Sequence, residues 1–116
     1  MQDRVELLQR VYRDFNRRNI EPLLAVLHHE VIWPNGWEGG TIVGRDGVRN
    51  YWTRQWAAIN PTVEPLGFQA LADGRIKVGV RQRVHNLAGE LAADEMVTHT
   101  FTFDGDLISR MEITQG

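Results

Sequence analysis

Apolar residues in the first part of the chain recur at spacings of three and four, which is typical of a helix with one buried face. Between Val5 and about Asn16 this spacing places Leu8, Tyr12 and Phe15 on the same side. The charged residues of this segment point elsewhere. The pattern predicts a first amphipathic helix whose C-terminal half presents two aromatic rings.

Two more helices and a short strand are predicted before the middle of the chain. Asn19 can cap the second helix, and Pro22 falls in its first turn, where a missing backbone N–H costs little. The β-prone run 31–33 predicts a short strand. Asp46 is the expected N-cap of the third helix, which ends before Pro61.

From residue 62 onward the pattern changes to that of β-strands. The predicted strands are 63–71, 76–87, 91–103 and 107–113. Their connections are too short for crossovers, so the strands are expected to be antiparallel. Long antiparallel strands twist and coil, which creates a concave face. The sequence therefore predicts an α+β fold, with three N-terminal helices packed in the concave face of a curved, mostly antiparallel sheet.

Length and composition narrow the class of protein. A chain of 116 residues fits a single domain over 1–116, and it contains no cysteine. Its net charge of −2 argues against a nucleic-acid partner, which needs a concentrated basic face. No segment resembles a signal peptide or a membrane span, so we expect a soluble, cytoplasmic protein with no membrane partner.

Five short motifs follow this order of elements over nearly the whole chain. They are Tyr12 with Phe15, Leu23-Leu24 to His29, Val31-Ile32-Trp33, Gly44-Arg45-Asp46-Gly47-Val48 and Phe101-Thr102-Phe103-Asp104-Gly105. Together they resemble the nuclear transport factor 2-like superfamily, and within it the SnoaL-like (polyketide cyclase) branch. The resemblance implies a cone-shaped α+β barrel around a small-molecule pocket, and a homodimer through the sheet face. It does not fix a reaction, because such proteins include enzymes and non-enzymatic binders.

One candidate catalytic set resembles that of limonene-epoxide hydrolase. The matching positions are Trp33 with Asn35, Arg83 with His85, and Glu112. In that family such groups position a water and protonate a leaving oxygen. This sequence departs from the pattern twice, because Trp33 replaces a tyrosine and His85 replaces the proton-donating acid. Strand alternation leaves an alternative open, in which Arg83 and Glu112 form an ion pair on the surface or at a subunit contact.

His99 is the best single candidate for a polar group inside a pocket. It alternates in phase with Phe101, so it projects from an otherwise apolar strand face. In the resemblance to ketosteroid isomerase, Tyr12 matches the oxyanion-holding tyrosine and His99 takes the place of a protonated aspartate. Pro34 or Asn35 occupies the place of the catalytic base, so that reaction is not supported. His99 is either catalytic or a core histidine bonded to Tyr12 or to a backbone carbonyl.

Aromatic side chains are expected to line the pocket. They are Tyr12, Phe15, Trp33, Trp37, Trp52, Trp56 and Phe101. The run 28–30, His-His-Glu, does not predict a metal site, because adjacent side chains diverge and are better explained as solvated groups at a helix end. We expect neither a metal nor a cofactor.

Three functions remain open at this point. The first is a cofactor-independent acid/base enzyme, of the cyclase, dehydratase, isomerase or epoxide-hydrolase type, acting on a small apolar or partly polar molecule. The second is a non-catalytic binder of such a molecule. The third is a homodimeric interaction module.

Overall fold

The computed structural model describes residues 3–115, and Met1, Gln2 and Gly116 lie outside the described residues. The helices are α1 (Arg4–Asn16), α2 (Ile20–Ala25) and α3 (Arg45–Ala58). The strands are β1 (Leu27–Pro34), β2 (Thr41–Val43), β3 (Asn60–Ala70), β4 (Ile76–His85), β5 (Leu91–Asp104) and β6 (Leu107–Gln115). Helices precede most strands along the chain, as the sequence predicts.

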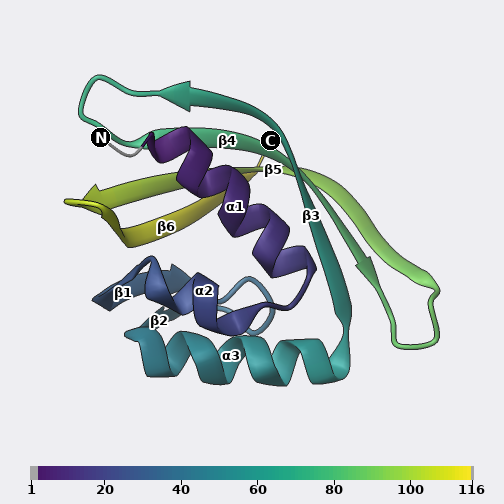
Figure 1. Ribbon diagram of the computed structural model, residues 1–116. Coiled ribbons are helices and arrows are strands. Elements are labelled where there is room, and N and C mark those ends of the chain that lie inside the picture. The colour runs from purple at the N-terminus through teal and green to yellow at the C-terminus, as the bar shows by residue number, and fades with distance from the viewer. Residues whose placement is uncertain (1–2, 116) are drawn as a thin grey trace.

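The six strands form one curved sheet in the order β2-β1-β6-β5-β4-β3. All neighbours are antiparallel except β1 and β6, which are parallel. Figure 1 shows β3, β4 and β5 arching around the helices, so the helices occupy the concave side of the sheet. The predicted α+β class and the mostly antiparallel sheet are confirmed, although the sheet does not close into a complete barrel.

Several local predictions were wrong, each for a physical reason. Strand β2 was missed because three residues are too few to show a period. Strand β1 begins at Leu27, so residues 28–30 lie on a strand and not at a helix end. The N-cap of α3 is Gly44, whose φ of 87° suits glycine, and not Asp46. Strand β3 includes Pro61, which is tolerated because β3 lies at the edge of the sheet.

A bulge in β6 changes which side chains face the interior. The β5–β6 register shifts between Thr102 and Phe103, which pair with Arg110 and Ile108. Simple alternation without a bulge would place Ile108 and Glu112 on the same face. The bulge instead buries both Ile108 and Met111, while Glu112 stays exposed.

The C-terminal end of α1 is held against β3 by side chains that bond to the backbone. Asn16 Nδ2 donates to the Val63 carbonyl at 2.8 Å, and Asn16 Oδ1 accepts from the Val63 N–H at 2.9 Å. Arg18, in the left-handed region with φ 62°, donates to the carbonyls of Phe15 and Pro61. These contacts fix the position of the aromatic end of α1 over the sheet.

No helix in the range 3–115 is long and apolar enough to cross a membrane. The location of the protein in the cell stays a prediction from the sequence.

Replacement of Asn16 by Ala is expected to lower the free energy of unfolding by about 1–3 kcal/mol, because the Val63 N–H and the Val63 carbonyl each lose a hydrogen bond to Asn16. Urea titration followed by tryptophan fluorescence measures this loss. Asn50→Ala is the matched control, since Asn50 is exposed and its change should stay within about 0.5 kcal/mol. Equal effects at the two sites would contradict the anchoring role of Asn16.

Candidate functional site

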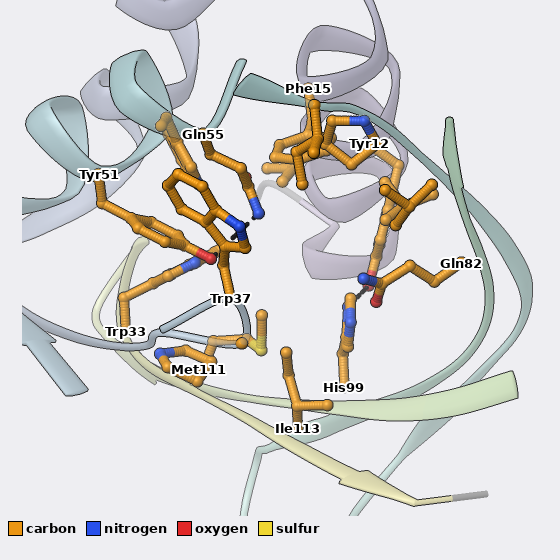
Figure 2. Close-up of a pocket in the computed structure, with 18 of the residues that line it drawn as sticks. Tyr12, Phe15, Trp33, Trp37, Tyr51, Gln55, Gln82, His99, Met111 and Ile113 are labelled. Atoms are coloured by element: carbon orange, nitrogen blue, oxygen red, sulfur yellow. Dashed lines mark hydrogen bonds between the residues drawn. The ribbon is translucent and has the colours of Figure 1, made fainter. Parts of the chain in front are cut away.

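A cavity of about 280 Å³ lies between the helices and the concave face of the sheet. Figure 2 shows its wall, to which α1, α3 and strands of the sheet contribute side chains. Most of this wall is apolar. Its aromatic members are Tyr12, Phe15, Trp33, Trp37, Tyr51, Trp52 and Phe101.

A buried hydrogen bond joins α1 to β5 inside this wall. The Tyr12 hydroxyl lies 2.7 Å from His99 Nδ1, and the two side chains are only 4% and 5% exposed. Their rings stack with an interplanar angle of 12°. His99 is in position because β5 pairs with β4 in a register that sets it opposite Val78, and its neighbour on the same face is Phe101.

Burial keeps both members of this pair uncharged. Desolvation lowers the pKa of His99 to about 4. The same cause raises the pKa of the Tyr12 hydroxyl well above its usual value. Near neutral pH the pair is therefore a neutral imidazole bonded to a neutral phenol.

The hydrogen-bond inventory decides the tautomer of His99. If Tyr12 donates to Nδ1, the proton of the neutral ring sits on Nε2 and leaves one donor without a partner. If Nδ1 donates to Tyr12, both the phenol proton and the Nε2 lone pair lack partners. The first arrangement leaves fewer unsatisfied groups, so we assign the proton to Nε2. Nε2 is buried and has no hydrogen-bond partner within residues 3–115.

A second polar pair lies on α3. Gln55 Nε2 donates to the Tyr51 hydroxyl oxygen at 3.2 Å, and both side chains line the cavity. Burial raises the pKa of Tyr51, and the backbone N–H groups of Trp37 and Gly36 partly offset this rise. In Figure 2, Tyr51 and Gln55 lie on the opposite side of the hollow from His99.

The SnoaL-like domain family model matches residues 8–111 of the chain. The protein belongs to the SnoaL-like domain family. No curated protein matches the chain.

Solved structures give the same result for the fold. TerC, co-crystallised with polyporic acid, is 26% identical with a TM-score of 0.83, over 97% of this chain and 91% of that one. An NTF2-like protein of unknown function from Burkholderia pseudomallei is 24% identical, with a TM-score of 0.85. The match covers 100% of this chain and 92% of that one. RV0760c from Mycobacterium tuberculosis, in complex with estradiol-17beta-hemisuccinate, is 18% identical, with a TM-score of 0.84. The match covers 99% of this chain and 95% of that one.

In this SnoaL-like domain, six of the seven aromatic residues predicted for the pocket lie in the cavity wall. Trp56 does not line the cavity. It stacks on Trp52 at a centroid distance of 5.8 Å and contacts Phe15 edge-on, so it supports the wall from behind. Its position one turn after Trp52 accounts for the stacking.

The candidate catalytic residues predicted beside His99 do not converge with it. Arg83 bonds to Glu64 at 3.2 Å on the sheet surface, and Glu112 lies 3.7 Å from Arg110. His85 lies on the same face of β4 as Arg83 and does not line the cavity either. Strand alternation explains this arrangement, because Gln82 and Val84 line the cavity and neighbouring residues of a strand point to opposite faces. The alternative of an ion pair between Arg83 and Glu112 is also not observed.

Asn35, predicted as a catalytic residue, forms hydrogen bonds within the loop that follows β1. Its Oδ1 accepts from the backbone N–H groups of Trp37 at 3.2 Å and Glu38 at 2.6 Å. Such side-chain-to-backbone bonds are typical of a turn. Asn35 therefore shapes the loop that carries Trp37 to the cavity.

Four side chains with polar atoms line the cavity and were not predicted to do so. They are Tyr51, Gln55, Gln82 and Glu95. Strand phase gives a signal for two of them, because Gln82 shares a face of β4 with Val84 and Glu95 shares a face of β5 with His99. Their polar character argued against this position, since polar strand residues are usually assigned to solvent. Tyr51 and Gln55 lie on α3, and their place in the wall depends on how this helix packs on the sheet.

The described part of the cavity wall contains no Ser, Thr, Cys or Lys side chain that could act as a nucleophile. Across residues 3–115, no cluster of His, Cys, Asp and Glu is arranged to hold a metal ion. His28 and His29 stack on each other on β1, and they contact Asp104 and Glu30 respectively.

The lowered pKa of His99 predicts a specific pH dependence of stability. In the unfolded chain His99 has a pKa near 6.5, and in the folded protein its pKa is about 4. Between these pH values the unfolded chain therefore binds a proton at His99 that the folded protein does not bind. The free energy of unfolding should therefore fall as pH falls from 6.5 toward 4, by at most about 1.4 kcal/mol per pH unit from this group.

Urea titrations between pH 7 and pH 4.5 measure this slope. His99→Gln retains a partner for Tyr12 and should show a smaller slope than the wild-type protein. His29→Gln, at an exposed position, should keep the wild-type slope. Identical slopes in all three proteins would show that His99 is not buried in the neutral form.

Proposed function

We propose that this SnoaL-like domain binds a small, mainly apolar molecule that carries a hydrogen-bond-accepting oxygen. The single observation behind this is the buried Nε2 of His99, a donor without a partner in an apolar wall. An unsatisfied buried donor costs about 1–3 kcal/mol, so a ligand oxygen that accepts from it recovers much of that cost. TerC, 26% identical and co-crystallised with polyporic acid, supports a small-molecule ligand.

The size of the cavity points to a ligand with about two rings. Its volume is about 280 Å³. An apolar protein cavity of about 150 Å³ holds benzene, so this one has room for two fused or linked rings. The aromatic wall favours flat ring systems, which stack or meet it edge-on.

Binding fits the geometry better than acid/base catalysis does. His99 has a pKa of about 4, so it is a weak base and it does not carry a transferable positive charge near neutral pH. Glu95 is the one carboxylate in the described cavity wall. It lies four residues from His99 on β5, which is about 13 Å along a strand, too far to share one reacting centre.

The ligand hypothesis can be tested with 1-tetralone, a fused two-ring ketone, and tetralin, the same ring frame without the oxygen. The ketone should bind about two- to tenfold more tightly, because one neutral hydrogen bond contributes about 0.5–1.5 kcal/mol. The shift in melting temperature over a ligand titration measures this difference.

The double variant Tyr12→Phe/His99→Leu removes both polar partners and leaves no unsatisfied group, so it should bind the two compounds equally. His85→Leu, outside the cavity, should keep the wild-type preference. If the wild-type protein binds neither compound, or binds both equally, the proposed function is wrong.

We also propose a homodimer formed through the sheet face that points away from the cavity. Leu66 and Met96 are 51% and 50% exposed on this face. They border a shallow hollow together with an Arg81–Asp94 ion pair of 2.7 Å. Apolar side chains beside charges of both signs can complement the same surface of a second copy across a two-fold axis.

Light scattering at micromolar concentration should give twice the mass of the chain. Met96→Glu places a charge in the proposed contact and should give the monomer mass. Leu87→Glu, in the turn between β4 and β5, is the control and should remain dimeric. A wild-type monomer would refute this assembly.

A further inference from the structure

The cavity wall contains one buried side-chain amide, that of Gln55. This residue is 8% exposed and lies on α3, where its neighbours in the wall are aromatic. A buried glutamine is uncommon, because the amide must find hydrogen-bond partners to offset its lost hydration.

The hydrogen bonds of Gln55 account for only part of its capacity. A side-chain amide offers two N–H donors and a carbonyl acceptor with two lone pairs. Nε2 donates to the Tyr51 oxygen at 3.2 Å. Oε1 makes no hydrogen bond to the described part of the chain, although the side chain lines the cavity. The amide oxygen is therefore an acceptor available to a bound molecule.

The bond to Tyr51 fixes the orientation of this amide. Tyr51 Oη accepts from Gln55, and the backbone N–H groups of Trp37 and Gly36 also face it. In this orientation Nε2 bonds to the Tyr51 oxygen, and Oε1 has no partner in the described part of the chain. The Gln55 oxygen is then free for the cavity.

The two polar pairs lie on opposite sides of the hollow. Figure 2 shows Tyr51 and Gln55 on the α3 side and His99 on the β5 side, with Met111 and Ile113 between them. One side offers a donor, the Nε2–H of His99, and the other offers an acceptor, the Gln55 oxygen. Met111 and Ile113 are apolar, so apolar side chains separate the two polar pairs.

We propose that Gln55 is a specificity-determining residue that accepts a hydrogen bond from a ligand hydroxyl. The ligand class is then a neutral ring compound with a carbonyl oxygen at the His99 end and a hydroxyl group at the Gln55 end. This inference rests on the proposed function, because it assumes that the carbonyl oxygen is bound by His99.

A neutral hydroxyl fits this position better than a charged group. Gln55 is uncharged, and Glu95 is the one acidic side chain in the described wall. A ligand ammonium at Gln55 would lose its hydration without gaining a paired charge, which is costly. A ligand carboxylate would meet an acceptor oxygen instead of a donor.

The test compares 1-tetralone with its 5-, 6- and 7-hydroxy derivatives, which direct a hydroxyl to different points on the far side of the ring frame. At least one isomer should bind the wild-type protein about two- to tenfold more tightly than 1-tetralone, the contribution of one hydrogen bond. Isothermal titration calorimetry gives the dissociation constants.

Gln55→Met has nearly the same shape and lacks the amide, so it should lose this gain and still bind 1-tetralone. Gln69→Met makes the same substitution at an exposed position on β3 and should keep the gain. The melting temperature of each variant shows that it is folded.

The outcomes separate the two proposals. If 1-tetralone binds better than tetralin but no hydroxyl isomer improves on it, the role of Gln55 is refuted and the proposed function stands. A gain that survives in Gln55→Met also refutes it, because another group then binds the hydroxyl. If 1-tetralone shows no preference over tetralin, the proposed function itself fails. The isomer comparison in the wild-type protein decides the question even if Gln55→Met does not fold.

Discussion

The hydrogen bond between Tyr12 and His99 is the contact on which the rest of the site depends. It joins the helix α1 to the strand β5 at 2.7 Å, deep inside the concave side of the sheet. Because both groups are buried, neither can exchange this partner for water, and the bond fixes the ring of His99 in one orientation. The contacts of Asn16 and Arg18 with β3 bring α1 to the distance at which this bond can form.

The cavity remains open because the aromatic rings pack against one another around it. Trp52 meets Trp33 edge-on at a centroid distance of 5.4 Å, and Phe15 meets Trp52 edge-on at 5.9 Å. Trp56 completes this group from behind by stacking on Trp52. Rings in contact on several sides resist collapse into the empty space, so the wall is preformed for a ligand.

Strand alternation keeps most charged side chains of β4 and β5 away from the cavity, with Glu95 as the exception. On β4 and β5, Arg81, Arg83 and Asp94 form ion pairs on the outer face, while Gln82 and His99 face inward without charge. An apolar interior strengthens each hydrogen bond formed there and penalises an unpaired charge. The same alternation thus places ion pairs on the outer face and leaves a mostly uncharged wall around the cavity.

The order of the helices and of every strand except β2 followed from the sequence by itself, as did the inward position of His99 beside Phe101. These features depend on periodicity within a single element, which the chain determines locally. The motifs of the chain also led to the correct family, which the match over residues 8–111 confirmed.

Only the tertiary structure decided which side chains meet. Alternation shows that Arg83 and Val84 lie on opposite faces, but it does not show which face is concave. The bulge in β6, which buries Ile108 and leaves Glu112 exposed, leaves no clear signal in the sequence. Gln55 reaches the same cavity as His99 only because α3 packs across the curved sheet from β5. Contacts between distant elements depend on twist, register and packing, and no short stretch of sequence determines these.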